Sequence, residues 1–375
     1  MTHLFEPLSL RGVTLPNRIA VSPMCQYSSD NGFANDWHLV HLGSRAAGGA
    51  GLVLTEATAV TPQGRISSRD LGIWSDSHIE PLSRIVRFID QQGSVAGIQL
   101  AHAGRKASVA PPWANRAGSL ADSEGGWPIV APASVVFDDG YALPEALSIE
   151  GIDNIVEAFV QGARRACLAG FRIAEIHAAH GYLLHQFLSP LSNQRSDRYG
   201  GTFENRTRLL RDIVSAVRGV WPEHLPLFVR ISATDWSDGG WDLEQSLALA
   251  SQLQLLGTDL LDCSSGGNLP HAVIPVGTGY QTAFAERIRR ETGIKTGTVG
   301  VISAPAQADH IIRSGQADLV LLGRELLRDP YWPLRAAREL GHPAPWPAQY
   351  VRAAPAHSPA HLPETAYCIL GRQMG

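Results

Sequence analysis

The sequence is poor in charge and contains no long apolar run. Charged residues make up 18% of its 375 residues, below the roughly 25% of an average soluble protein, which suits a chain that buries most of its surface in one large core. The formal net charge is −4, so the basic surface of a nucleic-acid-binding protein is missing. No window approaches the roughly 18 apolar residues of a membrane span, and the N-terminus lacks the basic and apolar regions of a signal peptide. We therefore expect a cytoplasmic protein with no nucleic-acid or membrane partner.

Lysine and paired cysteine are also scarce. The only lysines are Lys106 and Lys295, so chemistry that needs a lysine Schiff base has two candidate residues. The four cysteines contain no C-x₂-C pair, which argues against a zinc ribbon, an iron–sulfur cluster and a disulfide framework. Any cysteine with a chemical role must act alone, and no metal site is predicted. The cysteines are Cys25, Cys167, Cys263 and Cys368.

Eight short β-branched runs alternate with amphipathic segments along the chain. This order predicts an α/β fold, the closed parallel (β/α)₈ or TIM barrel, as one domain over residues 1–340. Residues 8–15 predict a hairpin before the first strand, residues 104–150 a Pro/Gly-rich lid insertion after the third, and residues 341–375 a Pro/Ala-rich C-terminal arm. The predicted strands are 18–24, 51–55, 95–100, 172–177, 227–232, 260–264, 295–299 and 319–322. The predicted helices are 37–47, 79–91, 152–169, 203–220, 243–256, 284–291 and 304–314.

The C-terminal ends of the predicted strands are unusually polar, and the active site of such a barrel lies at these ends. Gly297 and Gly323, on the seventh and eighth strands, predict a phosphate site because glycine lets backbone N–H groups approach an anion. Arg324 adds a bidentate, charge-assisted contact. The chain has no G-x-x-x-x-G-K-[ST] loop and no G-x-G-x-x-G after a strand, so ATP and a Rossmann-bound dinucleotide are poorly supported. A phosphate-bearing cofactor such as FMN or pyridoxal phosphate remains.

Five motifs at or near these strand ends, in order along the chain, resemble those of the Old Yellow Enzyme family. The cysteine of the first motif and the H-x-x-H of the third are similar to the thermophilic-like branch of ene-reductases, the NADPH dehydrogenase and xenobiotic reductase type. The motifs are SPMCQY at 22–27, QLAHAGRK at 99–106, HAAHGYLLHQFLSP at 177–190, RSDRYGG at 195–201 and GRE at 323–325.

The resemblance implies bound FMN, which passes hydride from NADPH or NADH to the activated C=C bond of a small unsaturated carbonyl or nitro compound. Gly297, Gly323 and Arg324 would then bind the phosphate. Arg230 would face the pyrimidine end of the flavin, where a fixed cation favours the reduced form. The other implied cofactor contacts are Ser22, Pro23, Met24, Cys25, Ala57 and Gln99, whose amide can meet both donors and acceptors of the ring.

The same resemblance implies the catalytic residues. His177 and His180 would hydrogen-bond the substrate carbonyl, and one helical turn from the end of the fourth strand would bring both imidazoles to one side. Tyr182 would protonate the α-carbon. Cys25 would tune the flavin and contact the substrate, and Tyr27 would add a hydrogen bond to the carbonyl. Lys106 matches a family position near the pocket, with no role assigned.

Alternatives remain for several of these residues. His177 and His180 are also spaced to share a metal ion, although no third ligand with suitable spacing follows. For Arg230, the alternative to a contact with the flavin is a structural role in an ion pair. His38 and His41 have the same spacing as the histidine pair but no strand end beside them, so we expect ordinary helix residues.

The C-terminal arm and the competing functions are the last open points. In this branch a C-terminal residue reaches across a dimer into the neighbouring pocket. Arg352 in the segment QYVR is the candidate, the alternative being a frayed tail. A homodimer or homotetramer is expected. The competing functions are a phosphate-binding barrel lyase or aldolase without redox chemistry, an iron–sulfur flavoenzyme and a non-catalytic flavin store.

Overall fold

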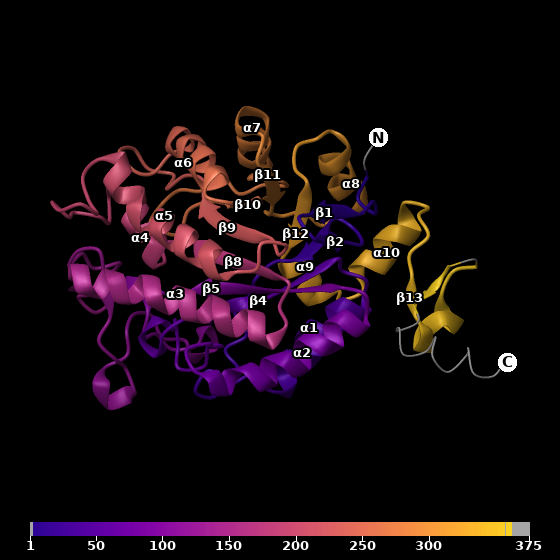
Figure 1. Ribbon diagram of the computed structural model, residues 1–375, viewed down its shortest axis with the longest axis horizontal. Coiled ribbons are helices and arrows are strands. Elements are labelled where there is room, and N and C mark those ends of the chain that lie inside the picture. The colour runs from indigo at the N-terminus through magenta and orange to yellow at the C-terminus, as the bar shows by residue number, and fades with distance from the viewer. Residues whose placement is uncertain (1–2, 357, 362–375) are drawn as a thin grey trace.

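A closed barrel of eight parallel strands forms the centre of the molecule (Figure 1). The computed structural model describes residues 3–356 and 358–361. β12 pairs with β3, so the last barrel strand closes onto the first. The predicted (β/α)₈ barrel is confirmed, because each of the eight predicted runs overlaps one barrel strand. The strands are β3 (Ile19–Val21), β4 (Leu52–Ala59), β5 (Val95–Ala101), β8 (Ile173–Ala178), β9 (Leu227–Ser232), β10 (Leu260–Ser264), β11 (Lys295–Thr298) and β12 (Leu319–Leu322).

Helices surround the barrel on its outside (Figure 1). The larger helices are α1 (Asp36–Ala47), α2 (Ile79–Gln91), α3 (Ile149–Ala169), α5 (Phe203–Val220), α6 (Leu243–Leu255), α7 (Thr282–Thr292), α8 (Pro305–Arg313) and α10 (Trp332–Glu339). Two short helices, α4 (Leu183–Leu188) and α9 (Arg324–Arg328), follow β8 and β12.

α3 begins three residues before the predicted start. Ser148 Oγ accepts the backbone N–H of Gly151 at 3.0 Å and caps the helix, so its first residue is Ile149. Ser148 was the signal for this start in the sequence. The predicted boundary relied on the apolar residues that follow the serine.

β4 also differs from its predicted bounds. It runs to Ala59 instead of ending at residue 55, and its register against β5 shifts between Leu54 and Ala57. Such a bulge inserts an extra residue and re-aims the side chains that follow it. Apolar alternation could not reveal it, because the residues beyond the bulge are polar or small.

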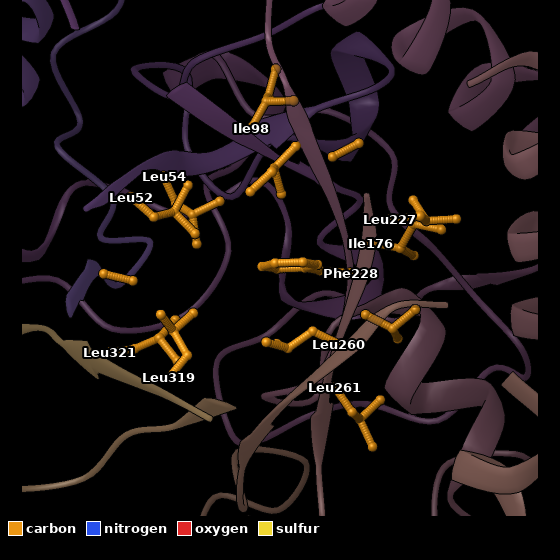
Figure 2. Close-up of a cluster of buried hydrophobic side chains, with 14 of the residues drawn as sticks. Leu52, Leu54, Ile98, Ile176, Leu227, Phe228, Leu260, Leu261, Leu319 and Leu321 are labelled. Atoms are coloured by element: carbon orange, nitrogen blue, oxygen red, sulfur yellow. The ribbon is translucent and has the colours of Figure 1, made fainter. Parts of the chain in front are cut away.

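The barrel interior has an apolar layer toward its N-terminal end. In Figure 2, Phe228 lies near the middle of a group that includes Leu52, Leu54, Leu260, Leu319 and Leu321. All of these side chains are buried, and Phe228 is directly paired with Leu260 across β9 and β10. The layer fills the barrel, so any ligand must lie above it at the C-terminal ends of the strands.

The N-terminal hairpin forms as predicted, from β1 (Leu8–Leu10) and β2 (Val13–Leu15). The Gly12 N–H donates to the carbonyl of His224, which precedes β9, at 2.8 Å. The hairpin therefore contacts the N-terminal end of the barrel, opposite the predicted site.

The insertion after β5 crosses the site end of the barrel. It contains a pair of two-residue strands, β6 (Val130–Ala131) and β7 (Glu145–Ala146), and three 3-10 turns. Two of its aromatic side chains contact predicted site residues: the Trp113 ring lies 5.7 Å from that of Tyr27, and the Phe137 ring lies 4.7 Å from Lys106 Nζ.

The described part of the arm lies beside α10, at the right of Figure 1. It holds β13 (Trp346–Pro347), a 3-10 helix at Ala348–Ala353 and β14 (Ala360–His361). It is thus more regular than the extended segment that we predicted. The remainder of the arm, with Cys368, lies outside the described residues. Within residues 3–356 and 358–361 we find no helix with the length and apolarity that crossing a membrane requires.

Candidate active site

Three predicted catalytic side chains meet at the C-terminal end of β8. The rings of His177 and His180 are 5.2 Å apart, and the rings of His177 and Tyr182 are 5.1 Å apart, centre to centre. Both contacts are edge to face. The structure therefore brings the two imidazoles and the phenol into one group, as the sequence predicted.

The backbone that produces this group is a left-handed turn, and the predicted helical turn is wrong. His177 still belongs to β8, whereas His180 has φ +60° and Gly181 has φ +72°. The strain at His180 is offset by contacts, since its N–H donates to Ser232 Oγ at 2.9 Å. The Gly181 N–H donates to His185 Nδ1, also at 2.9 Å. Side chains that lie elsewhere in the fold thus select this turn.

Lys106 holds the same turn from the lid side. Its Nζ donates to the carbonyls of His180, at 2.9 Å, and of Gly267, at 3.0 Å. Burial, followed by the neighbouring charge of Arg105, lowers the pKa of Lys106 to about 8. The lysine, to which we assigned no role from the sequence, therefore positions the histidine turn.

Gly181 cannot be replaced without loss of stability. A Cβ at this position would lie 2.1 Å from the Gly267 carbonyl oxygen, and its φ of +72° disfavours any other residue. We expect Gly181→Ala to lower the free energy of unfolding by about 2–5 kcal/mol, from backbone strain and overpacking together. Urea unfolding followed by circular dichroism measures this loss.

The matched control is Gly219→Ala in α5, where a Cβ meets nothing within 4 Å. This change should leave stability unchanged or raise it by up to about 1 kcal/mol, because alanine favours the helix. Equal destabilisation by both substitutions would contradict our reading of the turn.

The two imidazoles are neutral at pH 7. Burial, reinforced by the charge of Arg230, lowers the pKa of both His177 and His180 well below the usual value. The Ala179 N–H donates to His177 Nδ1 at 3.3 Å, so the neutral ring of His177 carries its proton on Nε2. His180 Nε2 lies 2.7 Å from Ser264 Oγ. Over residues 3–356 and 358–361 no group of three or more possible ligands could hold a metal ion.

Cys25, Tyr27 and Tyr182 all stay protonated at neutral pH. Burial and the nearby carboxylates of Asp70 and Glu56 raise the pKa of the Cys25 thiol well above its usual value. Burial also raises the pKa values of Tyr27 and Tyr182. Cys25 is therefore a neutral thiol, and Tyr182 holds its phenolic proton.

A buried histidine–glutamate contact supports the first motif from behind, and sequence reasoning missed it. His38 Nε2 lies 3.2 Å from Glu56 Oε1, with both side chains almost fully buried. Glu56 Oε2 accepts the Gln26 N–H at 3.1 Å. His38, which we expected to be an ordinary helix residue, thus fixes the loop after Cys25. A glutamate directly after an apolar strand was the signal that could have revealed it.

A cavity of about 480 Å³ opens beside β11 and β12. Gly323, Arg324 and residues 299–303 line it, and α8 begins shortly after at Pro305. A glycine, a guanidinium and a helix N-terminus are the donors that a phosphate group requires. Gly297 does not line this cavity: it lies within β11, where a Cβ would meet Leu321 Cδ1 at 2.6 Å. Gly300, at the end of the same strand region, does line it.

Met24, one of the residues expected beside the flavin ring, lies next to this cavity, and the polar groups of the other residues suit such a ring. A Cβ at Gly323 would lie 3.7 Å from Met24 Sδ, so the first and last motifs meet. Ser22, Ala57, Gln99 and Arg230 are all buried in the C-terminal half of the barrel. Gln99 Nε2 donates to Glu175 Oε1 at 2.8 Å, which leaves its amide oxygen for a ring N–H. Arg230 is ion-paired with Asp262 at 2.9 Å. Arg230 therefore does form the structural ion pair that was its alternative role. Asp262 holds the guanidinium in place and leaves it within the candidate site.

Arg352 is exposed on the 3-10 helix of the arm. Tyr350, on the same turn, contacts Tyr331 at 6.1 Å between ring centres. The described residues show no contact between Arg352 and the histidine group of its own chain.

These features define a TIM-barrel flavin oxidoreductase: an anion cavity after the last two strands, an amide and a guanidinium beside it, and a polar group at the strand ends. A family model described as the NADH:flavin oxidoreductase / NADH oxidase family matches residues 3–342. The chain belongs to this family.

Relatives and solved structures agree with this assignment. The chain is 51% identical to an NADPH dehydrogenase of Halalkalibacterium halodurans, over 94% of this chain and 99% of the relative. It is 48% identical to an NADPH dehydrogenase of Bacillus subtilis (strain 168), over 93% and 98%. Morphinone reductase superposes with a TM-score of 0.74 at 28% identity, over 91% and 90% of the two chains. The old yellow enzyme homologue of Zymomonas mobilis gives 0.76 at 25% identity, over 90% and 93%.

The protein is thus an FMN enzyme that oxidises NADPH or NADH, and the predicted family, cofactor and donor are confirmed. The lyase alternative loses its support. Lys295 is exposed at the first residue of β11, which is the end of the barrel opposite the site. Lys106 is occupied by two carbonyls.

Proposed function

We propose that the enzyme reduces the activated C=C bond of small α,β-unsaturated carbonyl or nitro compounds. The observation that carries this proposal is the group of two neutral imidazoles and one phenol at the end of β8. Such a group offers hydrogen-bond donors to one oxygen atom and a proton to a nearby carbon. Bound FMN would supply the hydride.

His177 and His180 bind the carbonyl or nitro oxygen of the substrate. Each neutral ring has one N–H, and the proton of His177 lies on Nε2 because Nδ1 accepts from Ala179. The contact of His180 Nε2 with Ser264 Oγ, at 2.7 Å, holds the second ring in place beside the first. Preorganised donors stabilise the negative charge that develops on the oxygen as the β-carbon accepts hydride. Tyr27 adds a donor, and the neutral Cys25 thiol contacts substrate and cofactor.

Tyr182 donates the second proton, to the α-carbon. Its raised pKa keeps the phenol protonated, and the α-carbanion of an enolate is a far stronger base than a phenolate. Lys106 lies 5.1 Å from the Tyr182 ring, on the side where the lid closes the site. A cation there stabilises the phenolate that remains after proton transfer.

The cofactor is held by its two ends. Bound FMN would have its ring held by Ser22, Pro23, Met24, Cys25, Ala57 and Gln99, its pyrimidine end by Arg230, and its phosphate by Gly300, Gly323 and Arg324. Residues 1–340 act as one catalytic domain with a lid at 104–150, and the enzyme works in the cytoplasm.

We also propose that the enzyme is a homodimer or homotetramer in which Arg352 reaches a neighbouring site. Tyr350 and Val351, beside Arg352, are 46% and 42% exposed in the single chain. Exposed apolar side chains of this kind support a surface that another subunit covers in the assembly. Light scattering of the purified protein tests the state, and a monomer that is fully active would contradict the proposal.

Arg324→Ala should weaken FMN binding about 10- to 100-fold, because it removes a charge-assisted contact worth about 1.5–3 kcal/mol. Fluorescence titration of the apoprotein with FMN measures the dissociation constant. Arg324→Lys should recover part of the loss, and Arg313→Ala on the outer face of α8 is the matched control. An unchanged dissociation constant for Arg324→Ala would place the phosphate elsewhere.

The function itself is tested by product analysis. FMN-loaded protein is given NADPH and 2-cyclohexenone without oxygen, and the products are separated by gas chromatography. We expect one cyclohexanone for each NADPH consumed. NADPH consumption that occurs only with oxygen, without saturated product, would show a flavin oxidase instead.

A further inference from the structure

Four polar side chains form a layer inside the barrel, between the apolar layer and the strand ends. Gln99 on β5 is directly paired with Glu175 on β8, and Arg230 on β9 is directly paired with Asp262 on β10. Gln99 Nε2 donates to Glu175 Oε1 at 2.8 Å, and Arg230 Nε lies 2.9 Å from Asp262 Oδ2. Each of the two polar residues expected to meet the flavin ring is thus held from behind by a carboxyl group.

The charges of this layer do not balance. Glu175 and Asp262 are completely buried, and a single guanidinium faces them. Glu175 Oε2 has no hydrogen-bond partner among the described residues. Two buried carboxylates with one cation would leave an uncompensated negative charge in a medium of low dielectric, which is costly. One carboxyl group must therefore hold a proton at neutral pH.

Glu175 is the group that holds it. Asp262 is the direct ion-pair partner of Arg230 and keeps its charge, although burial raises the pKa of both acids. Burial, with the charge of Asp262, raises the pKa of Glu175 to about 8. The charged or titratable groups facing Glu175 are Arg230 on β9 and Asp262 on β10, with His177 two residues further along β8. β5 contributes the neutral Gln99.

We propose that Glu175 is a redox-linked proton site, which binds its proton more tightly when the flavin above it is reduced. The proposal rests on FMN lying against Gln99 and Arg230. NADPH delivers a hydride, which is two electrons and one proton, so the ring gains one negative charge. Above about pH 8, where Glu175 is ionised in the oxidised protein, a further proton from solvent binds its carboxylate and cancels that charge. When the hydride passes on to the acceptor at such a pH, Glu175 returns this proton to solvent. At neutral pH Glu175 holds its proton in both states.

The physical reason is the repulsion between like charges. A negative charge on the reduced ring disfavours the ionised form of a carboxyl group nearby. By linkage, an ionised Glu175 must also disfavour reduction. Glu175 therefore keeps the layer neutral while Arg230 meets the charge of the reduced ring.

The test is the two-electron midpoint potential of the FMN-bound protein, measured at a series of pH values from about pH 7 to about pH 9.5. In a two-electron couple, each proton taken up on reduction lowers this potential by about 30 mV per pH unit. The wild type should fall by about 30 mV per pH unit near pH 7, and by about 60 mV per pH unit above about pH 8, where Glu175 is ionised in the oxidised protein. Glu175→Gln should keep the slope of about 30 mV throughout, because glutamine mimics the neutral acid. Parallel lines for the two proteins over the whole range would overturn the proposal.

Two further variants keep the test decisive if the glutamine variant binds FMN poorly. Asp262→Asn removes the like charge beside Glu175, so the steeper region should begin at lower pH. Glu145→Gln changes an exposed glutamate of the lid and should behave as the wild type does. An Asp262→Asn curve that superposes on the wild type would also overturn the proposal.

Failure of this inference is separable from failure of the proposed function. The potentials are set with dithionite and a mediator dye, without NADPH or an alkene. A protein that shows the steeper slope but forms no cyclohexanone would retain the proton site and lose the ene-reductase assignment.

Discussion

Replacing His177 and His180 together by alanine should slow alkene reduction at least about 10³-fold and leave FMN bound. Removal of one preorganised oxyanion donor costs about 10²–10³ in rate, and here both donors are lost. The side chains meet at the strand end and do not line the phosphate cavity, so cofactor affinity should change little. Stopped-flow reoxidation of the reduced enzyme by 2-cyclohexenone measures the rate, and the flavin spectrum measures occupancy.

The controls separate hydrogen bonding from packing. A double asparagine variant keeps N–H donors and should retain much more activity than the alanine pair. His310→Ala, at an exposed position on α8, should match the wild type. Loss of FMN from the alanine pair would show that the histidines are structural and would contradict the role that we propose for them.

Tyr182→Phe should slow the step in which the alkene is reduced by about 10²–10⁴-fold, the usual contribution of a positioned general acid. The phenol is the group that remains protonated beside the histidines, because burial raises its pKa. Reduction of the flavin by NADPH needs no proton from Tyr182, so its rate should stay within a few-fold of the wild type.

The two half-reactions of this variant are measured separately by rapid mixing without oxygen. Tyr199→Phe, which changes a buried phenol beside α5, is the matched control. Alkene reduction at the wild-type rate in Tyr182→Phe would show that another group, or water, supplies the proton.

The barrel was predictable because its determinants are local. Most strands are short runs of apolar or β-branched residues, and the helices have apolar residues at three- and four-residue spacing, so the order of elements follows from the chain alone. The site end of the barrel followed as well, since the ends of eight parallel strands must meet at one rim. The motif that resembles known ene-reductases lies on that rim, where the structure brings His177, His180 and Tyr182 together.

What the sequence could not reveal depends on partners far away in the chain. The left-handed turn at His180 is held by Ser232 and Lys106, which are 52 and 74 residues away in the chain. The pairing of Glu175 with Gln99 follows from the register of β8 against β5.

Which glycine lines the cavity depends on the fold in a similar way. Gly297 and Gly300 are both candidates in the sequence, and only the depth to which β11 enters the barrel shows which of them lines the cavity.

The central claim is that this strand-end group activates an alkene toward hydride from the bound cofactor. The most direct test reduces FMN-loaded protein with one equivalent of NADPH under argon and then mixes it with 2-cyclohexenone, while the flavin absorbance is followed. We predict bleaching with NADPH, followed by full return of the yellow colour as one equivalent of cyclohexanone forms. A protein that stays bleached until oxygen is admitted would contradict the claim.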